Sequence, residues 1–209
     1  MDFTTAYDAI LAIGASPGAR EVTVAMRQAF EARAGAFGPE DPWFEARSRA
    51  FWDDALTTQG FPRHVEADLV PDARAWIVSL ERAHRGLFRA TQEPSDASRT
   101  WSIDDLWSGA SFLVAAPEPG LREALATSTY FDGRVVGRAD PLTLVLLPGA
   151  VFHPADAKEP IEKVLEAARA RGLVKDVVLD ALLRMERNLR SHSRVKAAYA
   201  YRSEALPKT

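Results

Sequence analysis

Cysteine is absent from this chain of 209 residues. Disulfides, thiolate metal sites and cysteine nucleophiles are therefore excluded. Long apolar runs are also missing: the longest, Leu142–Leu147, is interrupted by Thr143 and falls far short of the roughly 20 residues that span a bilayer. The first residues include Asp2 and Asp8 but no early Lys or Arg, so they lack the positive start of a secretory signal. We expect a cytoplasmic protein without membrane contact.

Charge of one sign is not in large excess, since the formal net charge is −3. The overall charge therefore does not indicate a nucleic-acid-binding protein. Hydrophobic residues make up 47% and charged residues 26% of the chain, which is the balance of an ordinary globular protein. The basic residues are mostly arginine and many apolar ones are alanine. This usage is typical of a GC-rich bacterial genome.

Recognisable catalytic and ligand motifs are lacking as well. None of the four histidines, His64, His84, His153 and His192, has a second ligand at metal-site spacing. No serine lies in the Gly-x-Ser-x-Gly pattern of a nucleophile elbow, and no glycine string resembles a phosphate-binding loop. The sequence predicts no metal site, no cofactor and no catalytic residue that can be assigned from a motif.

Four dispersed residues remain as candidates for an active site. His153 lies at an expected strand-to-helix junction, and Arg134 lies between two glycines in a strand pattern. Asp104 and Asp105 are adjacent, so their side chains point apart on a helix or a strand, and one of them is expected to cap the turn before Leu106. An enzyme built from such residues is the third functional alternative.

Three helical stretches are expected in the N-terminal part of the chain. Ser16-Pro17 starts the first, which ends at Gly35, because proline is favoured at the first helical position and glycine after the last. Asp41-Pro42 repeats the start signal, and that helix ends at Gly60. The third follows Pro71, with an apolar stripe at helical spacing as far as Phe88.

The pattern then changes to short segments rich in Val, Leu and aromatic residues, bounded by Gly, Pro and Asp, which favour strands. The expected strands are Arg99–Ile103, Ala110–Ala116, Tyr130–Arg138 and Leu142–Leu147. Thr91–Ser98 is expected to be a loop, Pro117–Thr129 to hold a helical turn, and Arg138–Pro141 to join the last two strands. These segments predict a small, mostly antiparallel sheet or partial barrel.

Two amphipathic helices are expected to close the fold. The first ends at Gly172 in the left-handed conformation, and Asp176 caps the second. The predicted fold class is therefore α+β, because helices and strands arrive in blocks. Residues 1–92 form a helical region, 99–153 a small β region, 156–190 a helical hairpin and 191–209 a basic tail, all in one domain. Residues expected to be buried are Trp76, Leu80, Leu87, Val135, Leu144, Leu146, Leu165 and Leu182.

A basic segment near the C-terminus is the most unusual feature. Between Arg184 and Arg202 it carries +5, which leaves −8 for the rest of the chain. Arginine and tyrosine together suit contacts with an acidic protein surface and contacts with nucleic acid. They also suit a solvated helix end, or a tail that folds onto the acidic remainder. The predicted partner-binding residues are Arg187, Arg190, Arg194, Lys196, Tyr199, Tyr201 and Arg202.

We expect a non-enzymatic interaction or regulatory protein that binds an acidic protein partner through this segment, with the aromatic group Trp43–Trp52 as a second surface. The alternative is a nucleic-acid-associated protein that uses the same segment. Ala168, Gly172 and Val178 match helix-turn-helix spacing, but Asp176 and Asp180 would face phosphates, so an ordinary helical hairpin explains them better. Homo-oligomer formation is left open.

Overall fold

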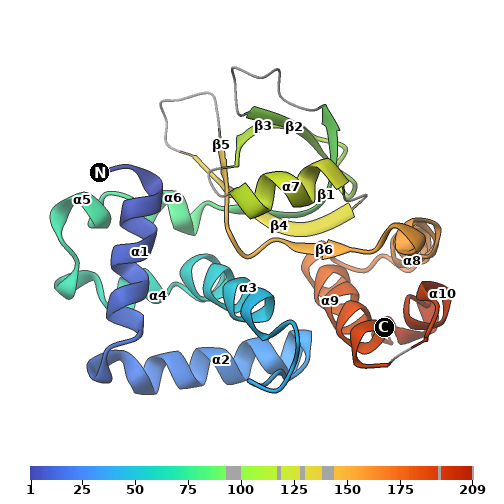
Figure 1. The fold of residues 1–209 in the computed structure, drawn as a ribbon, viewed down its shortest axis with the longest axis horizontal. Coiled ribbons are helices and arrows are strands. Elements are labelled where there is room, and N and C mark those ends of the chain that lie inside the picture. Colours follow the sequence, from blue (N-terminus) through green and yellow to red (C-terminus); the bar gives the residue numbers. More distant parts are fainter. Residues whose placement is uncertain (93–99, 117–118, 128–129, 138–143, 193, 209) are drawn as a thin grey trace.

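A computed structural model describes residues 1–92, 100–116, 119–127, 130–137, 144–192 and 194–208. It is an α+β fold with N-terminal helices, a barrel-like sheet and C-terminal helices (Figure 1). The expected fold class is therefore confirmed. Within the described residues, no helix combines the length and the apolar character needed to cross a membrane.

The N-terminal region begins with a helix that the sequence patterns did not reveal. Asp2 caps it by accepting a hydrogen bond from the backbone N–H of Thr5 at 2.8 Å. The helix expected after Ser16-Pro17 begins with a 3-10 turn (η1) and ends at Gly35, whose φ of 95° suits glycine. The helical elements are α1 (Phe3–Gly14), η1 (Pro17–Ala19), α2 (Arg20–Ala34), α3 (Phe44–Thr57), α4 (Phe61–His64), η2 (Glu66–Asp68), α5 (Pro71–Arg74) and α6 (Ile77–Glu81).

The long third helix expected after Pro71 is wrong. Two short helices, α5 and α6, occupy its start, and strand β1 (His84–Gln92) takes its end. Leu87 and Phe88 are buried as expected, but they belong to β1. A short apolar run is compatible with either a buried helix or a buried strand, and here strand pairing decides. The boundary of the helical region at residue 92 therefore lies inside the sheet.

In the part of the chain that the structure describes, five strands close into a barrel and a sixth extends it. The order is β1-β2-β3-β5-β4-β6, and an additional pairing of β1 with β4 closes the ring. The pairs are antiparallel except β3 with β5, so the expectation of a mostly antiparallel sheet is confirmed. The remaining elements of this region are β2 (Thr100–Asp105), β3 (Ser111–Ala115), α7 (Pro119–Thr127), β4 (Tyr130–Val136), β5 (Leu144–Leu146) and β6 (Val151–His153). The expected loop Arg138–Pro141 lies outside the described residues.

Strand β4 is buried along its whole length, since every one of its residues is buried. One edge pairs with β1, and the other pairs with β6 near Tyr130 and with β5 near Val136. Helix α7 lies across the barrel in Figure 1 and buries Leu121 and Leu125 in the same cluster as Phe131.

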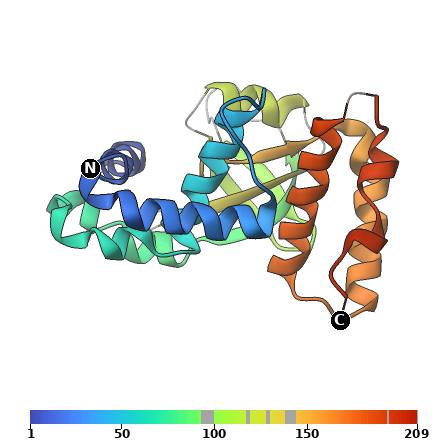
Figure 2. The ribbon, with the colours of Figure 1, turned by 90° about the horizontal axis from the view of Figure 1, so that it is seen from below.

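The C-terminal helices follow β6 and pack side by side (Figure 2). Gly172 separates the two long ones with φ 66°, as expected. The second begins at Lys175 with Val174 at the N-cap position, so the expected cap at Asp176 is wrong by two residues. The elements are η3 (Ala155–Ala157), α8 (Lys158–Ala170), α9 (Lys175–Ser191), α10 (Ala197–Ala200) and η4 (Ser203–Ala205).

Seven of the eight residues expected in the core are buried; the exception is Leu144, which is half-buried at one end of β5. The described core consists of three clusters, one centred on the N-terminal helices, one on the C-terminal helices and one inside the barrel. β1 contributes to two of them, since Leu87 packs with the C-terminal helices and Phe88 points into the barrel cluster.

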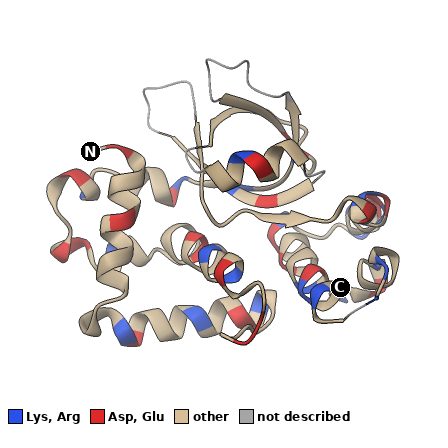
Figure 3. Cartoon of the chain, viewed as in Figure 1, with Lys and Arg blue, Asp and Glu red and all other residues tan. Residues whose placement is uncertain are grey.

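Buried charges join these three regions (Figure 3 shows the distribution of charge along the chain). Asp54 on α3 binds Arg33 of α2 at 2.6 Å and Arg134 of β4 at 2.7 Å. Burial acts to raise the pKa of Asp54, but the neighbouring Arg134 and Arg33 outweigh it, so the pKa lies below its ordinary value. The carboxylate therefore holds two helices against the barrel as an anion.

A second buried arginine ties the barrel to the C-terminal helices. Arg85 on β1 binds Asp132 of β4 at 3.1 Å and Asp180 of α9 at 2.7 Å. Burial raises the pKa of Asp132, although Arg85 and Arg134 both favour its charged form. Removing one member of such a set lowers the free energy of unfolding by more than the whole set contributes to it, because the remaining charge is left without a partner.

Candidate functional site

The seven residues expected to bind a partner do not form one exposed surface. Arg187 is half-buried, and its Nε donates to the backbone carbonyl of Ala36 after α2. Arg190 donates to the carboxylate of Glu186 one turn earlier and, at 3.3 Å, to the carbonyl of Phe152 on β6. These two arginines attach α9 to other parts of the fold.

Tyr201 is also part of the interior, with only 3% of its surface exposed. Its hydroxyl and Nδ1 of His153 are 2.7 Å apart, and the two rings meet edge to face. Burial lowers the pKa of His153 to about 4, so the imidazole is neutral at pH 7. Tyr201 therefore anchors the C-terminal segment to β6.

Arg190 keeps 42% of its side chain exposed, and the other four of these seven residues are exposed as well. Tyr199 on α10 has 68% of its surface accessible, the highest value among the large hydrophobic residues that the structure describes. Arg194, Lys196 and Arg202 lie within five residues of it in sequence and are also exposed, as is Val195. The surface that we call the α10 patch consists of Arg194, Val195, Lys196, Tyr199 and Arg202.

The four dispersed catalytic candidates make separate contacts. Arg134 and His153 are both 2% exposed, the first bound to Asp54 and the second adjacent to Tyr201. Asp104 forms a surface pair with Arg89 at 3.2 Å.

Asp105 caps the turn after β2, as expected for one of the two aspartates. It accepts hydrogen bonds from the backbone N–H of Trp107 at 3.0 Å and from the hydroxyl of Ser108 at 2.6 Å. Nε2 of His84 lies 3.0 Å from the same carboxylate. Because the Ser108 hydroxyl donates to Asp105 and not to His84, the trio lacks the nucleophile-to-base hydrogen bond of a serine hydrolase.

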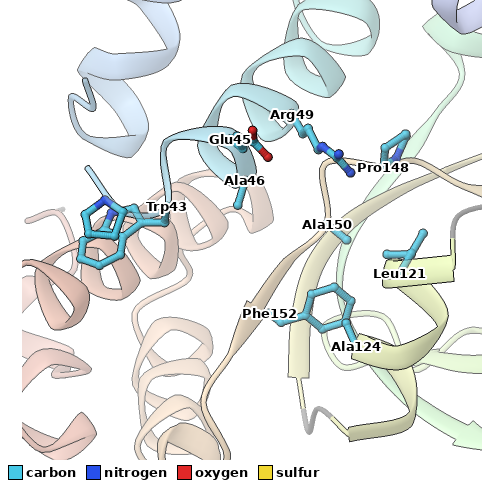
Figure 4. Close-up of a pocket in the computed structure, with 11 residues that line it drawn as sticks. Trp43, Glu45, Ala46, Arg49, Leu121, Ala124, Pro148, Ala150 and Phe152 are labelled. Carbon is cyan, nitrogen blue, oxygen red and sulfur yellow. The ribbon is translucent and has the colours of Figure 1, made fainter. Parts of the chain in front are cut away.

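A groove of about 540 Å³ lies between the start of α3, helix α7 and the segment that includes β6. Figure 4 shows Glu45 and Arg49 extending from α3 on one side and Leu121 and Phe152 on the other. Its volume falls within the range of small-molecule sites, roughly 300–1,000 Å³. Apolar side chains from α7 and β6 make up one wall, and α3 supplies the polar groups.

Gly149 allows the two walls of the groove to lie close together. A Cβ at this position would lie 2.4 Å from the carbonyl oxygen of Arg49, so only glycine allows the loop before β6 to approach α3 this closely. The Gly149 N–H donates to Asp53 at 2.8 Å, and the hydroxyl of Tyr7 donates to the other oxygen of the same carboxylate at 2.8 Å.

A smaller pocket of about 140 Å³ adjoins the groove and shares Trp43, Ala46, Ala150 and Phe152 with it. Its far side is a cluster of charges, in which Arg47 and Glu186 are buried and Arg190 is partly exposed. Arg47 on α3 binds Glu186 of α9 and, at 2.8 Å, the carbonyl of Leu183. Arg190 binds the other oxygen of Glu186, so two arginines share one carboxylate.

Several buried polar atoms around this pocket have no hydrogen-bond partner among the described residues. They are Trp43 Nε1, Arg47 Nη1 and, on the adjacent β6, His153 Nε2. Unpaired buried donors are rare in native proteins, because each one loses its hydrogen bond to water without replacement. The sequence did not predict that these three atoms lie beside a pocket. Trp43 was noted in the sequence only as part of an aromatic group, and Arg47, although it lies at helical spacing from the buried Phe51, was not identified as a site residue.

Metal ligands are not grouped in the described part of the chain: no set of three His, Asp or Glu side chains could hold an ion there. Comparison with known protein families, with curated proteins and with solved structures found no match to this chain. Function therefore has to follow from the chemistry of its own residues.

Proposed function

We propose that this chain is a non-enzymatic interaction protein that binds an acidic protein partner through the α10 patch. The observation that carries the proposal is the exposure of Tyr199, whose ring lies on the surface with basic residues on both sides of it in sequence. Tyrosine and arginine are enriched in the contacts that dominate binding energy. A basic rim favours a partner with carboxylates and speeds its association.

The patch contains fewer residues than the sequence suggested, because Arg187, Arg190 and Tyr201 make contacts within the fold. Variants that test binding at the α10 patch must leave these three residues intact. The triple variant Tyr199→Ser, Lys196→Glu and Arg202→Glu changes only exposed side chains. Its matched control is Val174→Ser, Arg20→Glu and Arg82→Glu, which alters one exposed hydrophobic residue and two exposed arginines elsewhere.

The experiment is affinity capture from the source cell, followed by binding measurements with the purified partner. We expect the wild type and the control to bind one partner with equal affinity, and the patch variant to bind at least tenfold more weakly. Association should slow as salt rises, because screening weakens the attraction between exposed charges. A partner that binds the patch variant as tightly as the wild type would refute the proposal.

Nucleic acid is the second candidate, and the same variants test it. Wild-type binding to a short oligonucleotide at physiological salt, lost in the patch variant and falling steeply with salt, would favour this candidate over the protein partner. Analytical ultracentrifugation of wild type and patch variant tests self-association through the same surface.

A further inference from the structure

We propose that the groove and the pocket beside Trp43 bind a small molecule with an apolar body and a single carboxylate group. This site is separate from the α10 patch and does not depend on it. The proposal rests on the shape of the site, on its unpaired donors and on its charge.

The shape provides two compartments of unequal size and character. The groove, of about 540 Å³, has an apolar wall that includes Leu121, Ala124 and Phe152. The pocket, of about 140 Å³, is bordered by the charged groups of Arg47, Glu186 and Arg190. A ligand that fills both has its apolar part against α7 and β6 and its polar part near α3 and α9.

The wall of the pocket contains buried donors that lack acceptors. Arg47 is 2% exposed, and its Nη2 has two acceptors while its Nη1 has none among the described residues. The indole N–H of Trp43 is a second buried donor without a partner. The N-terminus of the 14-residue helix α3 lies at the same place, and Trp43 at its N-cap gives no side-chain cap. Neither N–H group is accessible to water, so each acts on a ligand in the pocket through its electric field and not through a direct hydrogen bond. Because helix starts and unpaired N–H groups both attract anions, the pocket suits a negatively charged group.

The charge selects a monoanion. Arg47 and Arg190 carry two positive charges and share the single negative charge of Glu186, which leaves +1 at the pocket. A carboxylate neutralises this excess, whereas a phosphate dianion would place surplus negative charge beside Glu186. The planar arginine groups also match the planar geometry of a carboxylate.

Titration calorimetry and ligand-observed NMR with 4-phenylbutyrate test the proposal, with 4-phenylbutyramide and inorganic phosphate as comparison probes. We expect saturable binding of the carboxylate, at least tenfold weaker binding of the neutral amide, and no displacement of the carboxylate by phosphate at equal concentration. Absence of saturable carboxylate binding, or equal binding of the amide, would overturn the proposal.

Helix α7 offers a matched pair of variants that locate the binding. Ala124 is half-buried and lines the groove, whereas Ala126 is exposed on the same helix and does not. Ala124→Trp should abolish binding by filling the groove, and Ala126→Trp should leave the affinity unchanged. If both variants bind like the wild type, the ligand lies elsewhere and the assignment is wrong.

The charged end of the site is tested by Arg190→Gln, which removes the excess positive charge without touching the fully buried Arg47. We expect at least a tenfold loss of affinity for 4-phenylbutyrate and little change for the amide. An exposed arginine outside the site, Arg82, provides the control Arg82→Gln. Urea denaturation confirms that each variant is folded, so that an equal loss for both probes counts against a role for the charge.

Discussion

His153 couples the stability of the molecule to pH. Its imidazole is buried, and the low dielectric of its surroundings lowers its pKa from 6.5 to about 4, with Arg47 and Arg190 acting in the same direction against Glu186. Between these two pH values the unfolded chain binds a proton that the folded chain does not, so stability rises with pH across this window. As pH falls from 6.5 to 4, we expect His153 to cost up to about 3 kcal/mol of unfolding free energy.

The measurement is urea denaturation at pH 7, 5.5 and 4.5 for the wild type and for His153→Gln. The variant should lose less stability than the wild type between pH 7 and pH 4.5. Asp132, whose pKa is raised by burial, acts in the opposite sense but is present in both proteins. His64 is exposed, so His64→Gln should keep the full pH dependence of the wild type. Identical pH profiles for wild type and His153→Gln would show that His153 is not the coupled group.

At the scale of single residues, the sequence predicts which apolar side chains are buried better than which charged ones are. Leu80 and Leu182 lie in hydrophobic patterns and are buried, because burial of apolar surface is a general driving force. Burial of Arg47 depends on Glu186, which is 139 residues away in the chain. Such a pairing has no local signature, so the candidate pocket could not be found before the fold was known.

At the scale of elements, the strands depend on partners that the local pattern does not reveal. Residues 84–88 read as the end of a helix, yet they pair with β4 near residue 133. By contrast, the helix before Gly172 was expected, and the strand expected at Tyr130–Arg138 is observed as Tyr130–Val136, since each has a strong period or a clear boundary residue. Helix α1 was not among the expected helices, although Asp2 caps its first turn.

The ion pair between Arg85 on β1 and Asp180 on α9 provides a prediction at this scale. Arg85→Met keeps much of the side-chain volume but leaves Asp132 and Asp180 without their shared partner, apart from a 3.5 Å contact of Asp180 with Arg33. We expect the free energy of unfolding to fall by about 3–5 kcal/mol, as is typical when a buried ion pair loses one member. Urea denaturation at pH 7 measures the change.

The control for this variant is a pair of the same chemistry on the surface. Arg63 binds both oxygens of Glu81 at 2.6 and 2.8 Å but is about half exposed, so water screens the attraction. Arg63→Met should therefore cost much less stability than Arg85→Met. If the two variants lose equal stability, burial does not govern the strength of these pairs.

At the scale of the whole molecule, the C-terminal segment completes the core. Ala197, Tyr201 and Leu206 are buried in the cluster formed by the C-terminal helices. Arg171, the residue that follows α8, donates to the carbonyl of Pro207. This hydrogen bond fixes the end of the segment. Part of the basic segment is therefore structural, whereas the five residues of the α10 patch are exposed.

A chain that ends at Leu189 should consequently be less stable than the full chain. The truncation removes Tyr201 and Leu206, and full burial of a large apolar side chain contributes about 1.5–3 kcal/mol each. We expect a loss of about 3–6 kcal/mol, which is a large part of the stability of an ordinary domain. A chain ending at Pro207 keeps both side chains and should unfold at the same urea concentration as the full chain. Equal midpoints for all three chains would mean that the C-terminal segment does not pack on α8 and α9, and its arginines and tyrosines would then all be available to a partner.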